Sequence, residues 1–225
     1  MKLSAYWTIS RNLQRNLQRN LQQEKKQYEY YRDLLLTFDD YSAHNSDRQT
    51  DRQTDRQTRK IAVQWLPLGE IATDLYRGSG IRRDQITENG TPCVRYGEIY
   101  TTYNIWFDKC ASHTDETMLG TKKYFEHGDI LFAITGESVE DIAKSCVYVG
   151  SEKCLAGGDI VVMKHNQNPK YIAYALSTAN ARMQKSKGKV KSKVVHTNIP
   201  SIRNIIIPVP PLRRTTTHRL HPRPL

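Results

Sequence analysis

The sequence predicts an α+β fold, in which one mixed α/β domain is preceded by a long helix of the coiled-coil type. Three observations lead to this prediction. Residues 10–40 contain no glycine or proline and carry apolar side chains at helical spacing. From residue 61 onward, short apolar runs are bounded by glycine, proline or charged residues, which is typical of strands. Near residue 168 the sequence carries the start signal of a helix.

The first predicted element is a helix over residues 10–40. Its large apolar residues are spaced 4, 7, 3, 4 and 3 apart, which is the pattern of an a/d seam. The seam consists of Leu17, Leu21, Tyr28, Tyr31, Leu35 and Phe38. We expect this seam to pack against a partner helix, and the alternative is that it packs on its own domain. The sequence Arg-Asn-Leu-Gln occurs three times between residues 11 and 22, and each copy adds roughly 6 Å of helix.

Two segments are predicted to have no packed fold. Residues 41–60 contain three copies of Asp-Arg-Gln-Thr and are polar, so they are interpreted as a flexible linker. Residues 213–225 are interpreted as out-of-frame translation without an evolved fold. The globular domain is therefore placed at residues 61–212.

Within the globular domain, five segments are predicted as strands and one as a helix. The strand segments are residues 91–100, 128–135, 144–150, 157–163 and 203–209. The helix begins with Asn168 as N-cap and Pro169 at the first helical position. Its apolar face is formed by Ile172, Leu176, Ala179 and Met183.

The charge distribution points to a polyanionic partner. The net charge is +11 at pH 7, no Asp or Glu follows Asp159, and thirteen Lys or Arg residues lie between residues 160 and 225. Nucleic acid is the usual partner of such a surface, and a solubilising surface or an anionic membrane surface is the alternative. No apolar run is long enough to span a bilayer and no signal peptide is present. We therefore expect a cytoplasmic protein that has no membrane partner.

The strongest candidate for DNA contact is the basic segment 182–196. It contains Arg182 and five alternating lysines, namely Lys185, Lys187, Lys189, Lys191 and Lys193. In an extended segment alternate side chains share one face, so all five ammonium groups would project together toward phosphates. The alternative is a disordered basic loop.

A second group of candidates combines arginine and tyrosine. Arginine can read guanine edges, and tyrosine can bond to phosphates or bases. The group consists of Arg82, Arg83, Arg95, Tyr96, Tyr100 and Tyr103. Glu137, in a turn after an apolar strand, could accept a hydrogen bond from a cytosine amino group. The alternative for the tyrosines is an ordinary half-buried place in a sheet.

No catalytic site, metal site or cofactor is expected. Cys110 and His113 form only half of a zinc-like pair. Residues 168–171, Asn-Pro-Lys-Tyr, resemble the Asn-Pro-Pro-Tyr motif of amino-group DNA methyltransferases, but a helix start explains Asn168 and Pro169. No glycine-rich S-adenosylmethionine loop follows a strand upstream of this motif.

Several stretches in order resemble the specificity subunits of type I restriction-modification enzymes. The resemblance is carried by residues 26–32, 94–100, 128–132, 135–138, 141–144, 156–160 and 207–212. Together they span most of residues 21–212 and correspond to one spacer helix and one target-recognition domain of that family.

The resemblance implies a non-catalytic, sequence-specific DNA-binding chain. In that family two target-recognition domains, joined by antiparallel helices, each read half of a split site. The implied partners are double-stranded DNA, the methyltransferase subunits and, through them, the restriction subunits, and pairing with another half specificity subunit is left open. The alternatives are an inactive remnant that still binds a partner, and a fragment of an adenine DNA methyltransferase.

Overall fold

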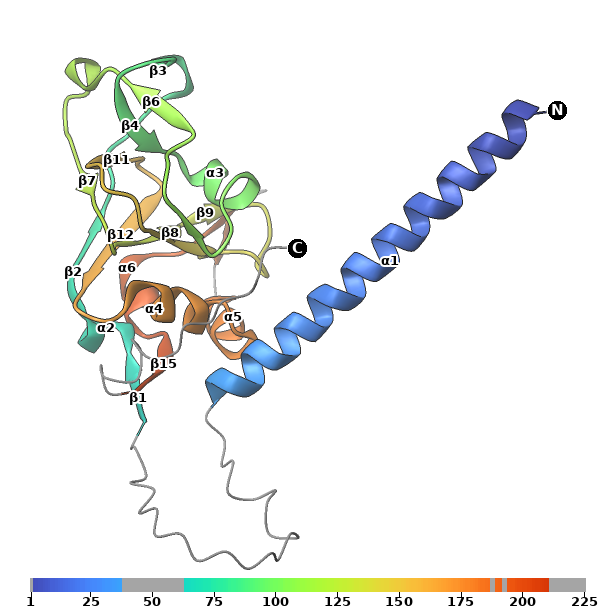
Figure 1. Cartoon of the computed structure of the whole chain (residues 1–225). Helices are drawn as coiled ribbons and strands as arrows, with labels where there is room; N and C mark the ends of the chain where they lie inside the picture. The colour runs from blue at the N-terminus through green and yellow to red at the C-terminus, as the bar shows by residue number, and fades with distance from the viewer. Residues whose placement is uncertain (1, 38–62, 187–188, 192–193, 211–225) are drawn as a thin grey trace, which may run out of the picture. The chain divides into compact units, whose positions relative to one another are not determined.

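The computed structural model of this chain describes residues 2–37, 63–186, 189–191 and 194–210. The chain divides into two units, Met1–Thr50 and Asp51–Leu225. The first contains the helix α1, and the second contains all the strands of the described residues (Figure 1). The predicted linker at 41–60 and the predicted tail at 213–225 lie outside the described residues.

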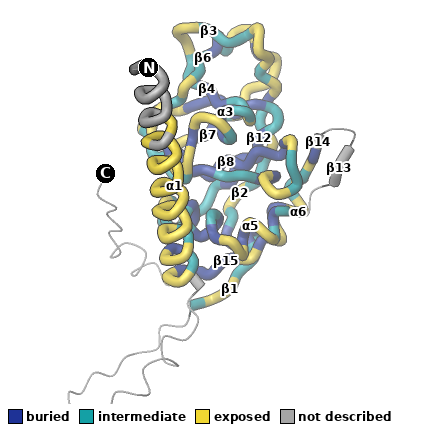
Figure 2. The backbone as a smooth tube through the Cα atoms, turned by 90° about the vertical axis from the view of Figure 1, so that its right-hand side faces the viewer, coloured by how far each residue is buried: buried dark blue, intermediate teal, exposed yellow. Residues whose placement is uncertain are grey.

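Helix α1 spans Lys2–Thr37 and confirms the predicted long helix. It begins earlier than the sequence pattern predicts, because residues 2–9 also lack glycine and proline. Its predicted end at residues 38–40 lies outside the described residues. Figure 2 shows that α1 is exposed along most of its described length.

One five-stranded sheet forms the centre of the second unit. Its order is β2-β12-β8-β10-β5, and only the pairing of β10 with β5 is parallel. In that order the strands are Ala72–Arg77, Ile160–His165, Ile130–Ala133, Ser145–Tyr148 and Trp106–Phe107.

A second five-stranded sheet, with the order β3-β6-β4-β11-β7, is also mixed. Only β4 and β11 pair in parallel. In that order the strands are Ile86–Thr87, Ser112–Thr114, Thr91–Val94, Cys154–Ala156 and Tyr124–Phe125. The mixed sheets and the helices confirm the predicted α+β class.

The central strands are buried on both faces, which explains their continuous apolar sequences. In β8, Ile130 and Phe132 pack into a cluster that includes Ile172 of α4 (Pro169–Leu176). Leu131 and Ala133 point the other way, into a cluster that includes residues of the second sheet. Figure 1 shows α4, α5 (Ala179–Lys185) and α6 (Ile199–Arg203) on one side of this sheet and β3, β4 and β6 on the other. The unit is therefore layered as helices, central sheet and second sheet.

Smaller elements close the unit. Strands β1 and β15, which are Gln64–Pro67 and Ile206–Val209, pair antiparallel. A three-stranded sheet has the order β13-β14-β9, with strands Lys189–Lys191, Val194–His196 and Thr135–Gly136. The short helical elements are α2 (Leu68–Ile71), η1 (Arg83–Gln85), η2 (Glu116–Met118) and α6 (Ile199–Arg203).

The strand predicted at residues 91–100 is only half correct. Strand β4 ends at Val94, and helix α3 spans Tyr96–Thr101. The side chain of Glu98 accepts a hydrogen bond from the backbone N–H of Arg95 at 3.1 Å, so it caps the first turn of α3. This local bond outweighs the strand preference of the tyrosine and isoleucine residues in the segment.

The single helix predicted after Asn168 is two helices. The N-cap is confirmed, since Asn168 Oδ1 accepts from the N–H of Tyr171 at 3.0 Å. However, α4 spans Pro169–Leu176 and α5 spans Ala179–Lys185. The Thr178 hydroxyl donates to the Ala175 carbonyl and accepts from the N–H of Ala181, so it ends one helix and caps the next.

The break between α4 and α5 also changes which residues face the core. Ile172 and Leu176 of α4 are buried as predicted. Ala179 and Met183 were predicted on the same apolar face, but both are exposed, and Met183 is 69% exposed. A helical face predicted as continuous cannot continue through a break in the helix.

Candidate nucleic-acid interface

The lysine-bearing hairpin is joined to the turn that contains Glu137. Strand β14 pairs with β9, with Val195 opposite Gly136 and His196 opposite Thr135. The pairing is reinforced by a hydrogen bond of 3.2 Å between Thr135 Oγ1 and His196 Nδ1. Segments separated by about sixty residues in the sequence are thus held side by side.

Helix α3 packs against the same turn. A Cβ atom on Gly136 would lie 2.7 Å from the hydroxyl oxygen of Tyr100, so a larger residue there would require the Tyr100 side chain to shift. The ammonium group of Lys144 donates to the Tyr100 carbonyl at 3.1 Å. Tyr96, one turn earlier on α3, is 40% exposed. Helix α3, with Tyr96 and Tyr100, and the predicted Glu137 turn therefore belong to one region.

A close backbone contact between residues 78–80 and Gly157–Gly158, called the glycine crossing below, links α3 to the segment that leads to Arg82. The N–H of Gly157 donates to the Val94 carbonyl at 2.9 Å, and Ser79 forms a parallel bridge with Gly157. A Cβ on Gly78 would lie 2.2 Å from the Gly157 carbonyl oxygen, so the two backbones touch. This contact places the segment before η1 beside the start of α3.

The three predicted arginines differ in their exposure and in the ion pairs that they form within the chain. Arg82 and Arg83 are exposed, and the ion pair of Arg82 with Asp84 at 3.4 Å is fully solvated. Arg95 is one third exposed and pairs with Glu98 at 3.3 Å. All three can still reach a ligand at the surface.

The predicted basic segment 182–196 is divided between a helix and two strands. Arg182 is exposed on α5. Lys189 and Lys191 lie in β13. Lys187 and Lys193 lie outside the described residues. Glu137, in the adjoining turn, is exposed.

Lys185 was predicted to contact phosphate, and that prediction is wrong. It lies at the end of α5 rather than in an extended segment, and it is only 7% exposed. Its ammonium group donates to the Ser145 hydroxyl and to the Leu176 carbonyl, each at 2.8 Å. Burial, followed by the nearby charge of Arg182, lowers the pKa of Lys185 to about 7.

Tyr103 was predicted as a DNA contact and is instead part of the core. It is 7% exposed, and its ring stacks on Phe107 with 4.1 Å between the centroids. Its hydroxyl oxygen accepts from the N–H of Ala111 at 2.7 Å, and burial raises the pKa of this hydroxyl. Tyrosine satisfies one polar atom and buries a large ring, which explains why it is suited to this position.

The asparagine at residue 168 has a structural role. In addition to this cap, the Tyr171 hydroxyl donates to the Pro208 carbonyl at 2.8 Å, which ties α4 to β15.

Among the described residues, no group of three His, Cys, Asp or Glu side chains could hold a metal ion. Within the same residues, no helix has both the length and the apolar character needed to cross a membrane.

A family model described as "Type I restriction modification DNA specificity domain" matches residues 63–217. The chain belongs to this family. The match covers all the described residues of the second unit, and the resemblance seen in the sequence is confirmed. A DNA specificity domain is a recognition unit, which agrees with the prediction of a non-catalytic chain.

Solved structures show that the specificity domain has the fold of type I specificity subunits. A chain from the complex assembly of a type I R-M system matches with a TM-score of 0.57 and 15% identity, over 90% of this chain and 45% of that one. The HsdS subunit from Thermoanaerobacter tengcongensis matches with a TM-score of 0.50 and 15% identity, over 90% and 44%. This chain spans less than half the length of either. None of the curated protein sequences matches it.

Sequence reasoning missed Arg77 in the specificity domain. Arg77 is exposed, pairs with Asp159 at 2.7 Å and donates to the Gly158 carbonyl. Arg77 therefore holds Gly158 and Asp159 next to residues 78–80, at the glycine crossing. The signal in the sequence was the Arg-Gly-Ser-Gly run at residues 77–80.

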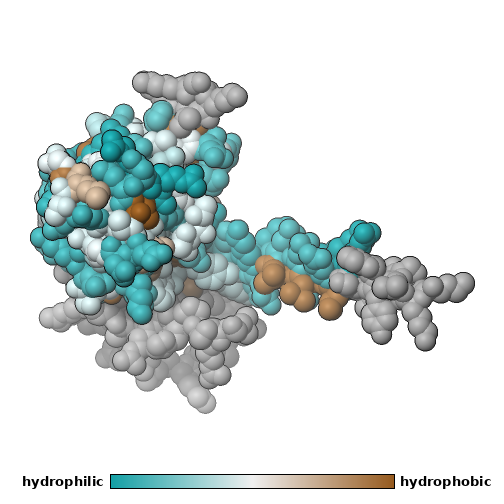
Figure 3. Space-filling view, turned by 90° about the horizontal axis from the view of Figure 1, so that it is seen from above, coloured by the Kyte–Doolittle hydropathy of each residue, from teal (hydrophilic) through white to brown (hydrophobic). Residues whose placement is uncertain are grey.

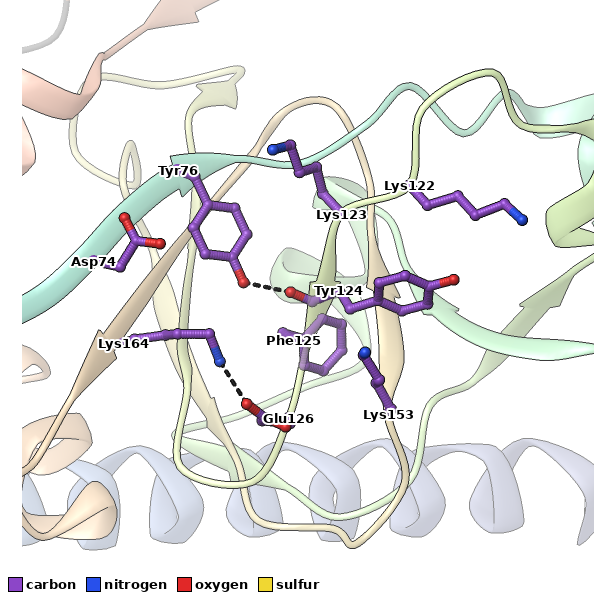
Figure 4. Close-up of a pocket in the computed structure, with 9 residues that line it drawn as sticks. All are labelled: Asp74, Tyr76, Lys122, Lys123, Tyr124, Phe125, Glu126, Lys153 and Lys164. Carbon is purple, nitrogen blue, oxygen red and sulfur yellow. Dashed lines mark hydrogen bonds and ion pairs between the residues drawn. The ribbon is translucent and has the colours of Figure 1, made fainter.

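The specificity domain also has a shallow basic pocket of about 500 Å³, away from the Glu137 turn in sequence (Figure 4). It is lined by Asp74, Tyr76, Lys122, Lys123, Tyr124, Phe125, Glu126, Lys153 and Lys164. Lys164 donates to Glu126 at 2.8 Å and to Asp129 at 3.0 Å, so it links β12 to the turn before β8. Lys153 lies 4.5 Å from the centroid of the Tyr124 ring. We interpret these contacts as structural.

Proposed function

We propose that this chain recognises double-stranded DNA by sequence and directs the methyltransferase and restriction subunits of a type I restriction-modification system to a split site. One observation carries the proposal. The β13–β14 hairpin, the Glu137 turn and α3 come from distant parts of the sequence and adjoin one another. Together they combine lysines suited to phosphates with arginine, tyrosine and glutamate side chains suited to base edges.

The roles within this interface follow from side-chain chemistry. Lys189 and Lys191 contact phosphates and position the duplex without reading it. Arg95 and Tyr96, at the start of the helix whose Tyr100 contacts Gly136, read bases. Arg82 and Arg83, at the other side of the glycine crossing, extend the same basic surface.

A selection from random-sequence duplexes tests this function. The purified full chain, alone and with its methyltransferase subunits, is expected to enrich one short sequence. Lys189→Ala should weaken binding without changing the enriched sequence, whereas Glu137→Gln should alter it. Equal binding to every duplex would contradict sequence recognition.

We also propose that α1 binds a partner helix. Leu17, Leu21, Tyr31 and Leu35 of the predicted seam are between 53% and 59% exposed, and Tyr28 is 41% exposed. Phe38 lies outside the described residues. Figure 3 shows an apolar patch on the surface of α1, and Leu13, at 62% exposure, extends the leucine row. Such a row is favourable only when it is covered.

The proposed partner of α1 is a helix of another half specificity subunit or of a methyltransferase subunit. Sedimentation of the full chain, alone and with the methyltransferase, distinguishes these partners. Leu21→Glu should prevent assembly, whereas Gln23→Glu, which adds the same charge on another side of the helix, should not. If both variants assemble like the wild-type chain, α1 is not the docking helix.

A further inference from the structure

The glycines of the second unit fall into two groups. At several positions the chain itself requires glycine, because a Cβ atom would collide with backbone. The collision would be at 2.2 Å for Gly78, 2.1 Å for Gly150 and 2.9 Å for Gly157. These residues need no explanation beyond the fold.

Gly97 belongs to the other group. It is the second residue of α3, and a Cβ atom there would meet nothing within 4 Å. Its backbone is helical and not in the left-handed region, so any residue could adopt it. Glycine inside a helix is less favourable than alanine. Neither packing nor backbone geometry within the chain requires glycine here.

The neighbours of Gly97 are those of the proposed DNA interface. Arg95 and Tyr96 precede it, and Tyr100 follows on the same helix, against the Glu137 turn. The carboxylate of Glu98 is occupied by the Arg95 N–H and by the Ser112 hydroxyl at 2.6 Å, so it does not project a charge beside Gly97. The space directly above the Gly97 Cα is thus open, and the Glu98 carboxylate does not project into it.

Gly80 repeats this pattern across the glycine crossing. A Cβ atom on Gly80 would also meet nothing within 4 Å, while its Cα lies 3.1 Å from where a Cβ on Gly158 would be. Gly157, the neighbour of Gly158, contacts the backbone of Val94 and Arg95 in the same way. Gly80 and Gly97 are therefore two glycines that no contact within the chain requires. Gly80 lies two residues before the exposed Arg82, and Gly97 lies at the start of α3.

We propose that Gly97 is the point where the sugar–phosphate backbone of the duplex approaches α3 more closely than a side chain would allow. This proposal rests on the proposed DNA-binding function and deepens it. Glycine at such a point permits direct approach of the ligand to the main chain. Arg95 and Tyr96 then reach past the backbone toward base edges, and the lysine hairpin holds neighbouring phosphates.

The experiment uses variants that enlarge residue 97 without weakening the helix. Gly97→Ala and Gly97→Leu introduce good helix formers of increasing size. Gly97→Ala should raise Tm by about 2 °C and weaken duplex binding by about tenfold, and Gly97→Leu should weaken it further. The probes are random-sequence duplexes measured with the full chain, and the sequence enriched by selection should stay unchanged.

Gly120→Ala is the matched control. A Cβ atom on Gly120 would likewise meet nothing within 4 Å, but Gly120 lies between η2 and β7, outside the proposed interface. Its substitution should leave binding as in the wild-type chain.

The outcomes separate this proposal from the function on which it rests. If Gly97→Leu binds like the wild-type chain while Lys189→Ala binds more weakly, the close approach at Gly97 is refuted and DNA recognition stands. If Gly97→Leu changes the enriched sequence, the contact is with bases and the backbone assignment is wrong. If the wild-type chain, with its methyltransferase present, binds no duplex, both proposals fail.

Discussion

The ammonium group of Lys185 lies 2.8 Å from the hydroxyl oxygen of Ser145, inside the core. Because burial lowers the pKa of Lys185 to about 7, the unfolded chain binds one more proton than the folded chain between about pH 7 and the ordinary lysine pKa of 10.5. The free energy of unfolding should therefore rise with pH above 7, with a slope of up to about 1.4 kcal/mol per pH unit. Chemical denaturation between pH 7 and 9 measures this slope.

Lys185→Met is the control for the pH prediction. Methionine has a similar length and no titratable group, so the slope between pH 7 and 9 should be smaller in this variant than in the wild-type chain. Equal slopes in the two proteins would show that Lys185 is charged in the folded state over this range.

The lysine hairpin should account for part of the salt dependence of DNA binding. Replacing both Lys189 and Lys191 by alanine should reduce the slope of log K against log salt by up to about two units, because each phosphate contact contributes about 0.9. The control is the pair Lys123→Ala and Lys153→Ala at the basic pocket, which removes the same net charge. If the two double variants change the slope equally, only net charge matters and the hairpin has no specific contact.

Continuous apolar segments made several of the buried strands predictable from the sequence. The runs at 128–135, 144–150 and 203–209 contain β8, β10 and β15, and the run at 157–163 contains the buried first four residues of β12, because buried strand positions on both faces are apolar. The start of α3 and the break after α4 were not predictable from periodicity. Each depends on one side chain, Glu98 or Thr178, that bonds to nearby backbone.

The candidate site was predictable in composition but not in placement. Charge and alternation selected the lysine segment, yet its first lysine lies in a helix and is buried. Lys185 could be buried because its ammonium group finds Ser145 and Leu176, which are 40 and 9 residues away in sequence. Tyr103 was misassigned for the same reason, since tyrosine is equally suited to an interface and to a core with one hydrogen-bond partner.

Tyr103→Phe should destabilise the fold without affecting DNA recognition. The change removes the 2.7 Å hydrogen bond from the N–H of Ala111, and the loss of one such bond costs about 0.5–1.5 kcal/mol. The stacked ring against Phe107 remains, so the structure should persist at lower stability. Thermal unfolding measures the loss, and duplex binding below Tm should match the wild-type chain. A selective loss of binding would return Tyr103 to the interface.

The Arg-Asn-Leu-Gln repeat should act as a length-setting element. Residues 11–22 lie within the uninterrupted helix α1, so one more copy adds four residues, about 6 Å of helix. Base pairs rise about 3.4 Å along B-DNA. In an assembly of two specificity domains held apart by such helices, an added copy should widen the gap between half-sites by one or two base pairs.

The bases read should not change with copy number, because the proposed reading surface lies in the second unit. Four residues also rotate α1 by about 40° beyond a full turn, so the seam should shift slightly in register. The measurement is methylation, by a two-domain form with its methyltransferase, of targets with varied gaps. Adding one Asp-Arg-Gln-Thr unit is the matched control, since it lengthens the chain equally outside α1. If forms with three and four Arg-Asn-Leu-Gln copies methylate the same gap, the helix does not set the spacing.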